Sequence, residues 1–264
     1  MELPEDMLRA AFASRRELDA LEAKARAALD RQLAGALEQV IEDLDSHGVS
    51  SLFERGQLRW VQLVLQSMQA ETDAALQRVL LRALRGGVGL GGAHALEELE
   101  AWVAKRGVVA SLNVKAAAEL AESLVVERVA ASLASWKREG VERMKPHLVR
   151  AMLSKSGDRR AADAIEEAFQ ARRFAAERIV RTELSTAYHR AHLNTLAQAK
   201  RDGLPVQKTC VAIFDGRTAR DSLPVHNQVR ELEEEFEDGK GRRYLAPPGR
   251  PNDREKMVAY LPPL

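Results

Sequence analysis

The sequence contains only one cysteine, Cys210, among its 264 residues. A single cysteine excludes an internal disulfide framework, and it excludes a zinc site built from several cysteines. The chain also lacks an apolar run of about 18 residues, the length that a membrane-spanning helix needs. Its N-terminus has no basic and apolar leader of the kind that directs secretion. We therefore expect a protein that neither spans a membrane nor is secreted, with the cytoplasm as its default compartment.

Charge of one dominant sign is also lacking. The chain carries 40 lysine and arginine residues against 39 aspartate and glutamate residues, a formal net charge of +1. A nearly neutral chain has no overall attraction to nucleic acid, so contact with DNA would need a local basic patch. Aromatic residues are scarce at 5%, which indicates a helix-rich body, and the length suits one or two domains.

Apolar residues recur three and four positions apart over long stretches, and this spacing predicts amphipathic helices. The first is expected from about residue 4 to residue 47, with a narrow apolar stripe that includes Leu29, Leu33 and Leu37. The apolar surface of this stripe is larger than a short helical hairpin can cover, so we expect these three leucines to bind a partner chain. Further helices are expected over about 57–85, 93–106, 115–145 and 160–200.

Five glycines fall within the seven residues from Gly86 to Gly92. Glycine loses much conformational entropy in a regular element, so this stretch predicts a hinge. A phosphate-binding loop is not favoured, because a helix precedes the glycines and Ala93-His94-Ala95 follows them. The expected organisation is an N-terminal helical region (1–85), the hinge (86–92), a middle helical region (93–157) and a final region (158–264). The final region holds a long helix and a small C-terminal β-containing module, so the fold class is α+β and predominantly α.

The module begins with the apolar, β-branched run Thr209–Phe214, which predicts a strand. Asp215 or Thr218 is expected to cap a short helical turn that Pro224 stops, and Asn227 suits a left-handed turn. A hairpin turn over 237–241 and a last strand over 257–261 should complete the module. We expect a metal-free apolar core of Val211, Ile213, Phe214, Val229, Phe236, Tyr244 and Val258.

This order of parts resembles the phage head-morphogenesis family, the F-like minor head protein of phage Mu and its relatives. The family has a helix with R-T-E, then an aromatic-led strand, a D-x-R-T turn, R-D-S-H and an L-x-G-Q turn. The resemblance covers roughly the last 90 residues; Leu223 stands where the family has a histidine, and the closing C-R-C is absent. The matching positions are Arg181, Thr182, Glu183, Asp215, Arg217, Thr218, Arg220, Asp221, Ser222, Gln228 and Phe236.

The resemblance implies a structural minor head protein of a tailed phage or prophage, without catalytic, cofactor-binding or metal-binding residues. Its expected partners are the portal protein and the major capsid or scaffold protein. Its expected location is the virion, at the capsid interior or portal vertex, after assembly in the host cytoplasm. The acidic hairpin Glu231–Asp238 is a second candidate surface for the portal, after the N-terminal stripe.

Two other functions fit parts of the sequence. A helical DNA-packaging or regulatory protein would use the basic residues of the 160–200 helix, although glutamates at salt-bridge spacing lie among them. These basic residues are Arg172, Arg173, Arg178, Arg181 and Arg190. An ADP-ribosyltransferase would use Arg178 or Arg181, Ser185-Thr186 and Glu233–Glu235, although the first two marks lie on a periodic helix rather than on strands.

Two smaller groups of residues have the side-chain types of a chemical site but lack the parts that such a site needs. His189 and His192 are spaced to share a metal ion, but they lack a third ligand. Asp221, Ser222 and His226 are the residue types of a hydrolase triad, but they lie within one tight turn without a nucleophile elbow. We therefore expect neither a metal site nor catalysis at these positions.

Overall fold

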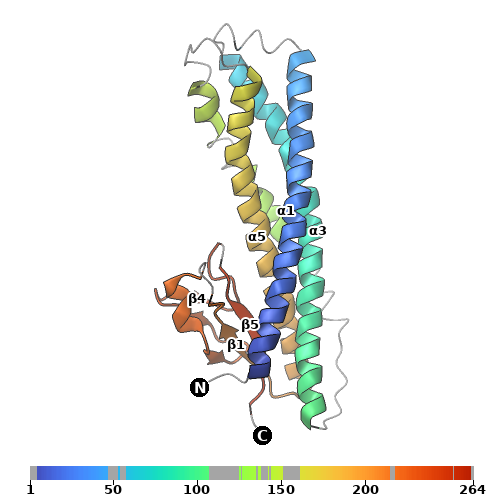
Figure 1. Ribbon diagram of the computed structural model, residues 1–264, viewed down its shortest axis with the longest axis vertical. Helices are drawn as coiled ribbons and strands as arrows, with labels where there is room; N and C mark the ends of the chain where they lie inside the picture. The colour runs from blue at the N-terminus through green and yellow to red at the C-terminus, as the bar shows by residue number, and fades with distance from the viewer. Residues whose placement is uncertain are drawn as a thin grey trace. The chain divides into compact units, whose positions relative to one another are not determined.

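The structure is a computed structural model, and its described residues include three long helices that precede a small C-terminal β module (Figure 1). The helices are α1 (Glu5–Ser46), α3 (Leu58–Arg106) and α5 (Ala161–Arg201). The fold is α+β and predominantly α, as predicted. No helix in the described part of the chain has the length and apolar character that a membrane crossing requires. The structure describes residues 5–46, 53, 58–106, 125, 127–134, 136–137, 142, 144–150, 161–214, 218–251 and 253–262.

The chain forms two compact units that each take in parts of all three helices. The first unit comprises Met1–Ala23, Arg82–Glu127 and Arg181–Leu264, and the second comprises Lys24–Leu81 and Arg128–Val180. The C-terminal module therefore belongs with one end of each helix rather than with α5 alone.

In the second unit, the expected partner-binding stripe of α1 is part of the core. Leu29 is 0% exposed and Leu33 is 1% exposed, while Leu37 is half-buried. The prediction that these leucines offer a surface to another chain is therefore wrong for Leu29 and Leu33. The physical reason is that distant segments of the same unit supply ample apolar side chains, which a short hairpin would lack. Buried examples are Trp60, Val64, Met68, Ile165 and Phe169.

In the first unit, the predicted hinge at 86–92 is wrong, because α3 continues through all five glycines to Arg106. The glycines allow α3 to approach the backbone of α5. A Cβ atom on Gly87 would lie 2.8 Å from a side-chain atom of Leu184, and one on Gly91 would lie 2.1 Å from the carbonyl oxygen of Tyr188. Packing against α5 thus offsets the helix-breaking tendency of glycine.

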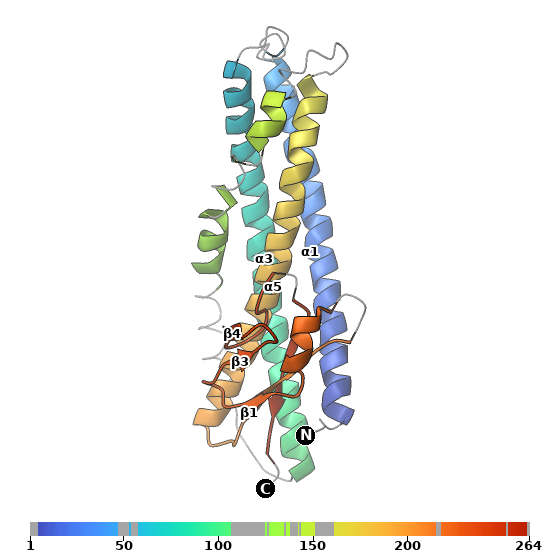
Figure 2. The ribbon, with the colours of Figure 1, turned by 90° about the vertical axis from the view of Figure 1, so that its left-hand side faces the viewer.

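The module contains a three-stranded antiparallel sheet in the order β2-β1-β5 and a two-stranded hairpin, β3-β4 (Figure 2). The strands are β1 (Gln207–Val211), β2 (Val229–Arg230), β3 (Phe236–Glu237), β4 (Arg243–Tyr244) and β5 (Lys256–Tyr260). In the central strand, Thr209 lies opposite Val229 on one side and Val258 on the other. The predicted hairpin and last strand are therefore confirmed. The predicted glycine, Gly203, lies two residues beyond the end of α5 with φ 96°.

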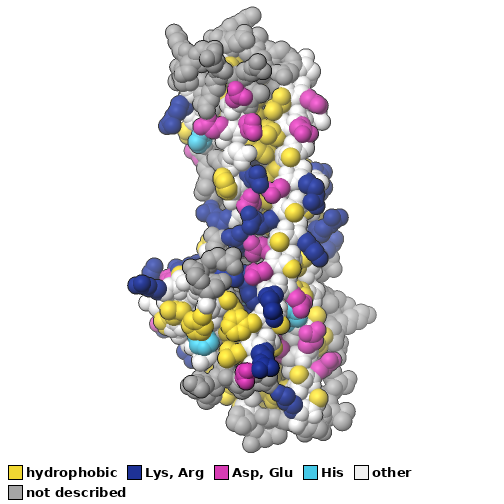
Figure 3. Space-filling model, in the orientation of Figure 1, with side chains coloured by type: hydrophobic (Ala, Val, Ile, Leu, Met, Phe, Trp, Pro, Cys, Tyr) yellow, Lys and Arg dark blue, Asp and Glu magenta, His cyan; other side chains and the backbone are white. Residues whose placement is uncertain are grey.

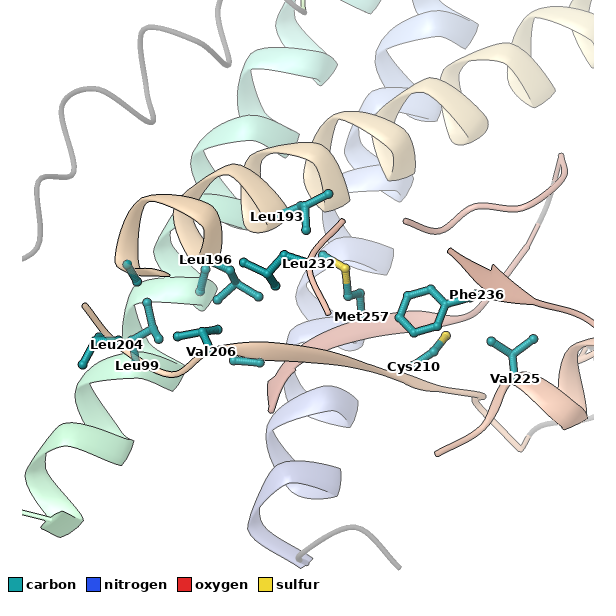
Figure 4. Packing of buried hydrophobic residues seen from close by; sticks show 13 residues of the cluster. Leu99, Leu193, Leu196, Leu204, Val206, Cys210, Val225, Leu232, Phe236 and Met257 are labelled. Carbon is teal, nitrogen blue, oxygen red and sulfur yellow. The ribbon is translucent and has the colours of Figure 1, made fainter. Parts of the chain in front are cut away.

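Both faces of the sheet are covered. Cys210 and Met257 are register partners, and they join a buried cluster with Leu196 of α5 and Phe236 of the hairpin (Figure 4). Residues one position further along a strand point to the opposite face. There Val211 and Val258 pack with Ala11 of α1.

The predicted core of the module is partly wrong. Val211, Ile213, Phe236 and Val258 are buried, and Val229 and Tyr244 are half-buried, but Phe214 is 62% exposed. The expected strand ran to Phe214, whereas β1 ends at Val211, whose register partner is Lys256. Among the described residues, no strand lies opposite those beyond this pair to fix the alternation of their side chains, and Phe214 turns outward.

A short 3-10 helix, η1 (Arg220–Val225), takes the place of the expected helical turn. The expected cap is wrong for Thr218, because the N-cap residue is Ala219 and the Thr218 hydroxyl donates to the carbonyl of Ile213. Asp215, the other candidate cap, lies outside the described residues, as does Arg217. Asn227 has φ 66°, which confirms the predicted left-handed turn.

Candidate functional site

Asp221, one of the residues that match the head-morphogenesis motif, binds three cations from two later segments. Its Oδ2 accepts hydrogen bonds from Arg242 and Arg250, each at 2.5 Å, and the Lys240 amine lies 3.4 Å away. The hydrogen bond from Arg250 is the main reason why the pKa of Asp221 lies well below its usual range. Asp221 therefore stays ionised and ties η1 to the hairpin and to the loop before β5.

Ser222, the next motif residue, is buried and joins η1 to the loop before β5. Its hydroxyl donates to Asp253 Oδ1 at 3.2 Å and accepts from Arg250 Nη2 at 3.0 Å. The other carboxylate oxygen of Asp253 accepts the backbone N–H of Gly249 at 3.1 Å. The serine hydroxyl thus acts both as a donor and as an acceptor inside the module.

Gln228 acts as a side-chain bridge to the hairpin. Its Oε1 accepts the Glu237 N–H at 3.2 Å, and its Nε2 donates to the Glu237 carbonyl at 2.7 Å and to the Pro224 carbonyl at 3.0 Å. The amide therefore satisfies backbone groups of β3 as a neighbouring strand would.

Phe236, the last motif residue, is completely buried under the amine of Lys208. The Lys208 Nζ lies 5.1 Å from the ring centroid and donates to the carbonyls of Leu232 at 2.9 Å and Leu245 at 2.7 Å. Burial lowers the pKa of Lys208 to about 8. The Phe236 ring and the Lys208 amine together fill the interior of the module between its strands.

The motif residues on α5 have a similar structural use. Arg181 Nε pairs with Glu22 Oε1 of α1 at 2.5 Å, and the carbonyl of Thr182 accepts the Thr186 hydroxyl at 2.9 Å. Glu183 is half-buried.

Arg220 is the exposed residue of the motif. With Asp221, Pro224, Gly239 and Lys240, it lines an open hollow of about 500 Å³.

Exposed apolar side chains mark one surface of the module. Phe214 is 62% exposed and Leu223 is 41% exposed. The Phe214 ring lies 4.7 Å from the ring of His226, measured between centroids, and His226 Nδ1 accepts the Ala212 N–H at 3.3 Å. Figure 3 shows apolar side chains gathered beside a histidine on this part of the molecule. We call Phe214 and Leu223 the apolar patch.

The acidic stretch is only partly available to a partner. Lys200, at the end of α5, binds Glu231 Oε2 at 2.8 Å and Glu233 Oε2 at 3.1 Å. Glu234 and Glu235 are exposed. We call these two glutamates the acidic edge.

The basic residues of α5 do not form a DNA-facing stripe. Arg172 is 2% exposed, pairs with Asp73 at 2.9 Å and lies 4.1 Å from the Trp136 ring centroid, so its prediction as a DNA contact is wrong. Burial lowers the pKa of Arg172 to about 10 despite the nearby Asp73. Arg173 pairs with Asp30 at 3.0 Å, and Arg181 with Glu22 as above. Arg178 and Arg190 remain exposed on the helix.

The catalytic alternatives do not assemble. The members of the triad-like set have other partners: Asp221 binds arginines, Ser222 binds Asp253, and His226 accepts a backbone N–H. The residues that resemble transferase motifs also do not all lie together. The helical rise places Lys200, which holds the acidic stretch, about 22 Å along α5 from Ser185.

A polar cluster between the sheet and the helices of the first unit is the main feature that sequence reasoning missed. We call it the helix–sheet joint. Glu98 Oε2 accepts the Ala259 N–H of β5 at 2.7 Å and binds His192 Nε2 at 3.0 Å, while the Lys256 amine lies 3.2 Å from the Tyr188 ring centroid. Its ionisable members are Arg15, Glu17, Asp19, His94, Glu98, Tyr188, His189, His192, Arg254 and Lys256.

The predicted histidine pair lies in this joint, but its two rings have separate partners. His189 Nδ1 donates to the Ser185 carbonyl at 2.8 Å, whereas His192 binds Glu98. Within the described ranges, no group of three or more His, Cys, Asp and Glu side chains could hold a metal ion. The one sequence signal for the joint is the placing of polar residues on otherwise buried helix faces.

Comparisons of this chain with protein-family models, with curated proteins and with solved structures found no significant match in any of the three. The resemblance to the head-morphogenesis family therefore stays a prediction from the residues quoted for it.

Proposed function

We propose that this chain is a structural minor head protein of a tailed phage or prophage. In this proposal it associates with the portal region during capsid assembly and DNA packaging or ejection, and it resides at the capsid interior or portal vertex. The proposal rests on the motif resemblance of the C-terminal region.

The observation that best supports the proposal is the use of the motif side chains inside the module. Asp221, Ser222 and Gln228 each join segments that are distant in sequence, and Phe236 fills the core between them. Polar side chains that are engaged in this way specify a folded module, whereas a reaction would need them directed at a substrate. A structural head protein requires a folded module of this kind.

The partner surface in this proposal lies on the C-terminal module. The N-terminal stripe is excluded as a ready surface, because Leu29 and Leu33 are buried. The apolar patch can supply desolvated contact area, and the acidic edge can steer association with a basic partner surface. These two features replace the N-terminal helix as the first candidates for contact with the portal.

The test is binding of the full-length chain to the purified portal protein of the same phage, measured by biolayer interferometry. The double variant Phe214→Ser/Leu223→Ser should weaken the equilibrium affinity by about tenfold or more, as loss of an apolar anchor does. Leu58→Ser is the matched control, because Leu58 is 63% exposed but belongs to the second unit. Charge reversal at Glu234 and Glu235 should mainly slow association and change its salt dependence.

Failure of the unaltered chain to bind the portal would contradict the proposed function. Binding that survives both sets of changes would leave the function in place and remove the apolar patch and the acidic edge from the interface. Circular dichroism of each variant shows whether the helices have been retained.

A further inference from the structure

Two of the three buried histidines of the helix–sheet joint, His189 and His192, each have one ring nitrogen without a partner among the described residues. The Ser185 carbonyl can only accept, so His189 carries its proton on Nδ1 and has a lone pair on Nε2. The carboxylate of Glu98 likewise places the proton of His192 on Nε2 and a lone pair on Nδ1. Neither lone-pair nitrogen has a hydrogen-bond partner in the described part of the chain.

The surroundings of His189 Nε2 favour the neutral ring of this histidine. The Lys256 amine and two nitrogens of Arg15, Nε and Nη1, are also buried without an acceptor among the described residues. Both His189 and Lys256 are 0% exposed. A further proton on His189 would add a buried donor and a positive charge at a point where the described residues offer no acceptor, which is costly.

His94 differs from the other two histidines, because both of its ring nitrogens have partners. One contacts the Tyr188 hydroxyl at 2.8 Å and the other contacts Glu17 at 3.1 Å. The acidic groups that face the joint are therefore engaged: Glu17 with His94, Asp19 with Arg15 at 2.6 Å, and Glu98 with His192.

The sign of the pH dependence follows from these contacts. Burial first, and the nearby Lys256 second, lower the pKa of His189 well below its usual value of 6.5. Below pH 6.5, a separated joint binds a proton at His189 that the closed joint does not bind. Opening should therefore become about tenfold more favourable for each pH unit and each such proton.

The interior of the C-terminal module has the opposite response to acid. Burial raises the pKa of Glu255 to about 7, so its protonated form is the one the module accommodates. Asp221 remains ionised among its arginines, and the protonated Lys208 amine has two carbonyl acceptors. Burial lowers the pKa of His226, but this partly exposed ring accepts the Ala212 N–H beyond the end of β1, outside the strand pairing of the sheet.

We propose that the helix–sheet joint is an acid-labile contact: uptake of a proton by the buried His189 releases the C-terminal sheet from helices α1, α3 and α5 while the sheet and hairpin stay folded. The contact that holds β5 to α3, from the Ala259 N–H to Glu98, is broken on release. The ion and hydrogen-bond network around Asp221 is kept.

Two backbone amides of the full-length chain report on these events separately. The Ala259 N–H is held across the joint by Glu98, whereas the Asp238 N–H is held within the hairpin by the Arg242 carbonyl at 3.0 Å. Residue-resolved hydrogen exchange by NMR, corrected for intrinsic rates, should be measured between pH 7.5 and 5.0. The opening constant at Ala259 should rise about 15-fold or more from pH 6.5 to 5.0, with Asp238 protection unchanged.

His189→Asn tests the origin of the effect, because the Asn amide can still donate to the Ser185 carbonyl but takes up no proton. Its Ala259 opening should depend on pH by about one proton less than the unaltered chain. His226→Asn is the control in the same module and should leave the Ala259 profile unchanged. Constant Ala259 protection across the pH range, or simultaneous loss of Ala259 and Asp238 protection, would overturn the proposal even if His189→Asn fails to fold.

Discussion

At the scale of single residues, Glu255 gives the module a pH-dependent stability. Its side chain is buried and accepts a hydrogen bond from the Tyr244 hydroxyl. Burial, and then the nearby Asp253 carboxylate, raise the pKa of Glu255 from 4.5 to about 7. The folded state therefore binds more protons than the unfolded state between these pH values. The stability that Glu255 contributes is complete below pH 4.5 and is lost as the pH rises through 7.

Glu255→Gln should remove this dependence, since the amide is neutral at every pH. Between pH 4.5 and 8, the free energy of unfolding of the variant should rise relative to the unaltered chain by about 3 kcal/mol. Urea denaturation at both pH values measures this difference, and contributions from other titrating groups cancel in it. Glu234→Gln, at an exposed carboxylate, is the control; parallel pH profiles for Glu255→Gln and the unaltered chain would contradict the prediction.

At the scale of elements, the glycines of α3 decide how closely it packs on α5. Gly91→Ala should lower the free energy of unfolding by about 3 kcal/mol, because the new methyl group meets the Tyr188 backbone and the helices must separate. Gly89→Ala is a matched control two positions away. A Cβ there meets nothing within 4 Å, so the higher helix propensity of alanine should stabilise by about 0.5–1 kcal/mol.

Both glycine variants can be compared by urea denaturation monitored by circular dichroism. Equal effects of the two substitutions would mean that the close helix contact does not control stability. Proteolysis gives a second readout of the same element, since a helical and packed 86–92 segment should resist early cleavage.

At the scale of the whole molecule, charge is nearly balanced and mixed. Figure 3 shows lysine and arginine side chains interspersed with aspartate and glutamate on the face in view. Among the five arginines of α5 considered for DNA contact, only Arg178 and Arg190 are exposed. Two exposed cations that neutralise phosphates would give a slope of log affinity against log salt of about −2 at most.

Fluorescence anisotropy with duplex DNA over a range of salt concentrations measures this slope. We expect weak binding with a slope no steeper than about −2, abolished by Arg178→Glu/Arg190→Glu. Arg9→Glu/Arg16→Glu makes the same change of charge on α1 and should have little effect. A slope near −6, or one that persists in the α5 variant, would instead favour the DNA-packaging function.

The amino-acid sequence by itself determined the features that depend on local conformational preference. The apolar spacing located α1 and α5, Gly203 marked the end of α5, and Asn227 marked a left-handed turn. The acidic turn between β3 and β4 and the last strand were predictable for the same reason. Each of these signals depends on neighbours within a few residues, so no knowledge of the tertiary contacts was needed.

Only the tertiary structure decided features that depend on residues distant in sequence. Gly87 and Gly91 stay helical because α5 packs against them, although their four-residue spacing was a visible signal of a close helix contact. From the sequence alone, Arg172 is expected to be a surface cation. In the structure it is enclosed by Asp73 and Trp136, which lie about 100 and 36 residues earlier in the chain. The joint at Lys256 likewise draws on three helices and a strand. Local propensities amount to about 1 kcal/mol or less per residue, so such packing and pairing outweigh them.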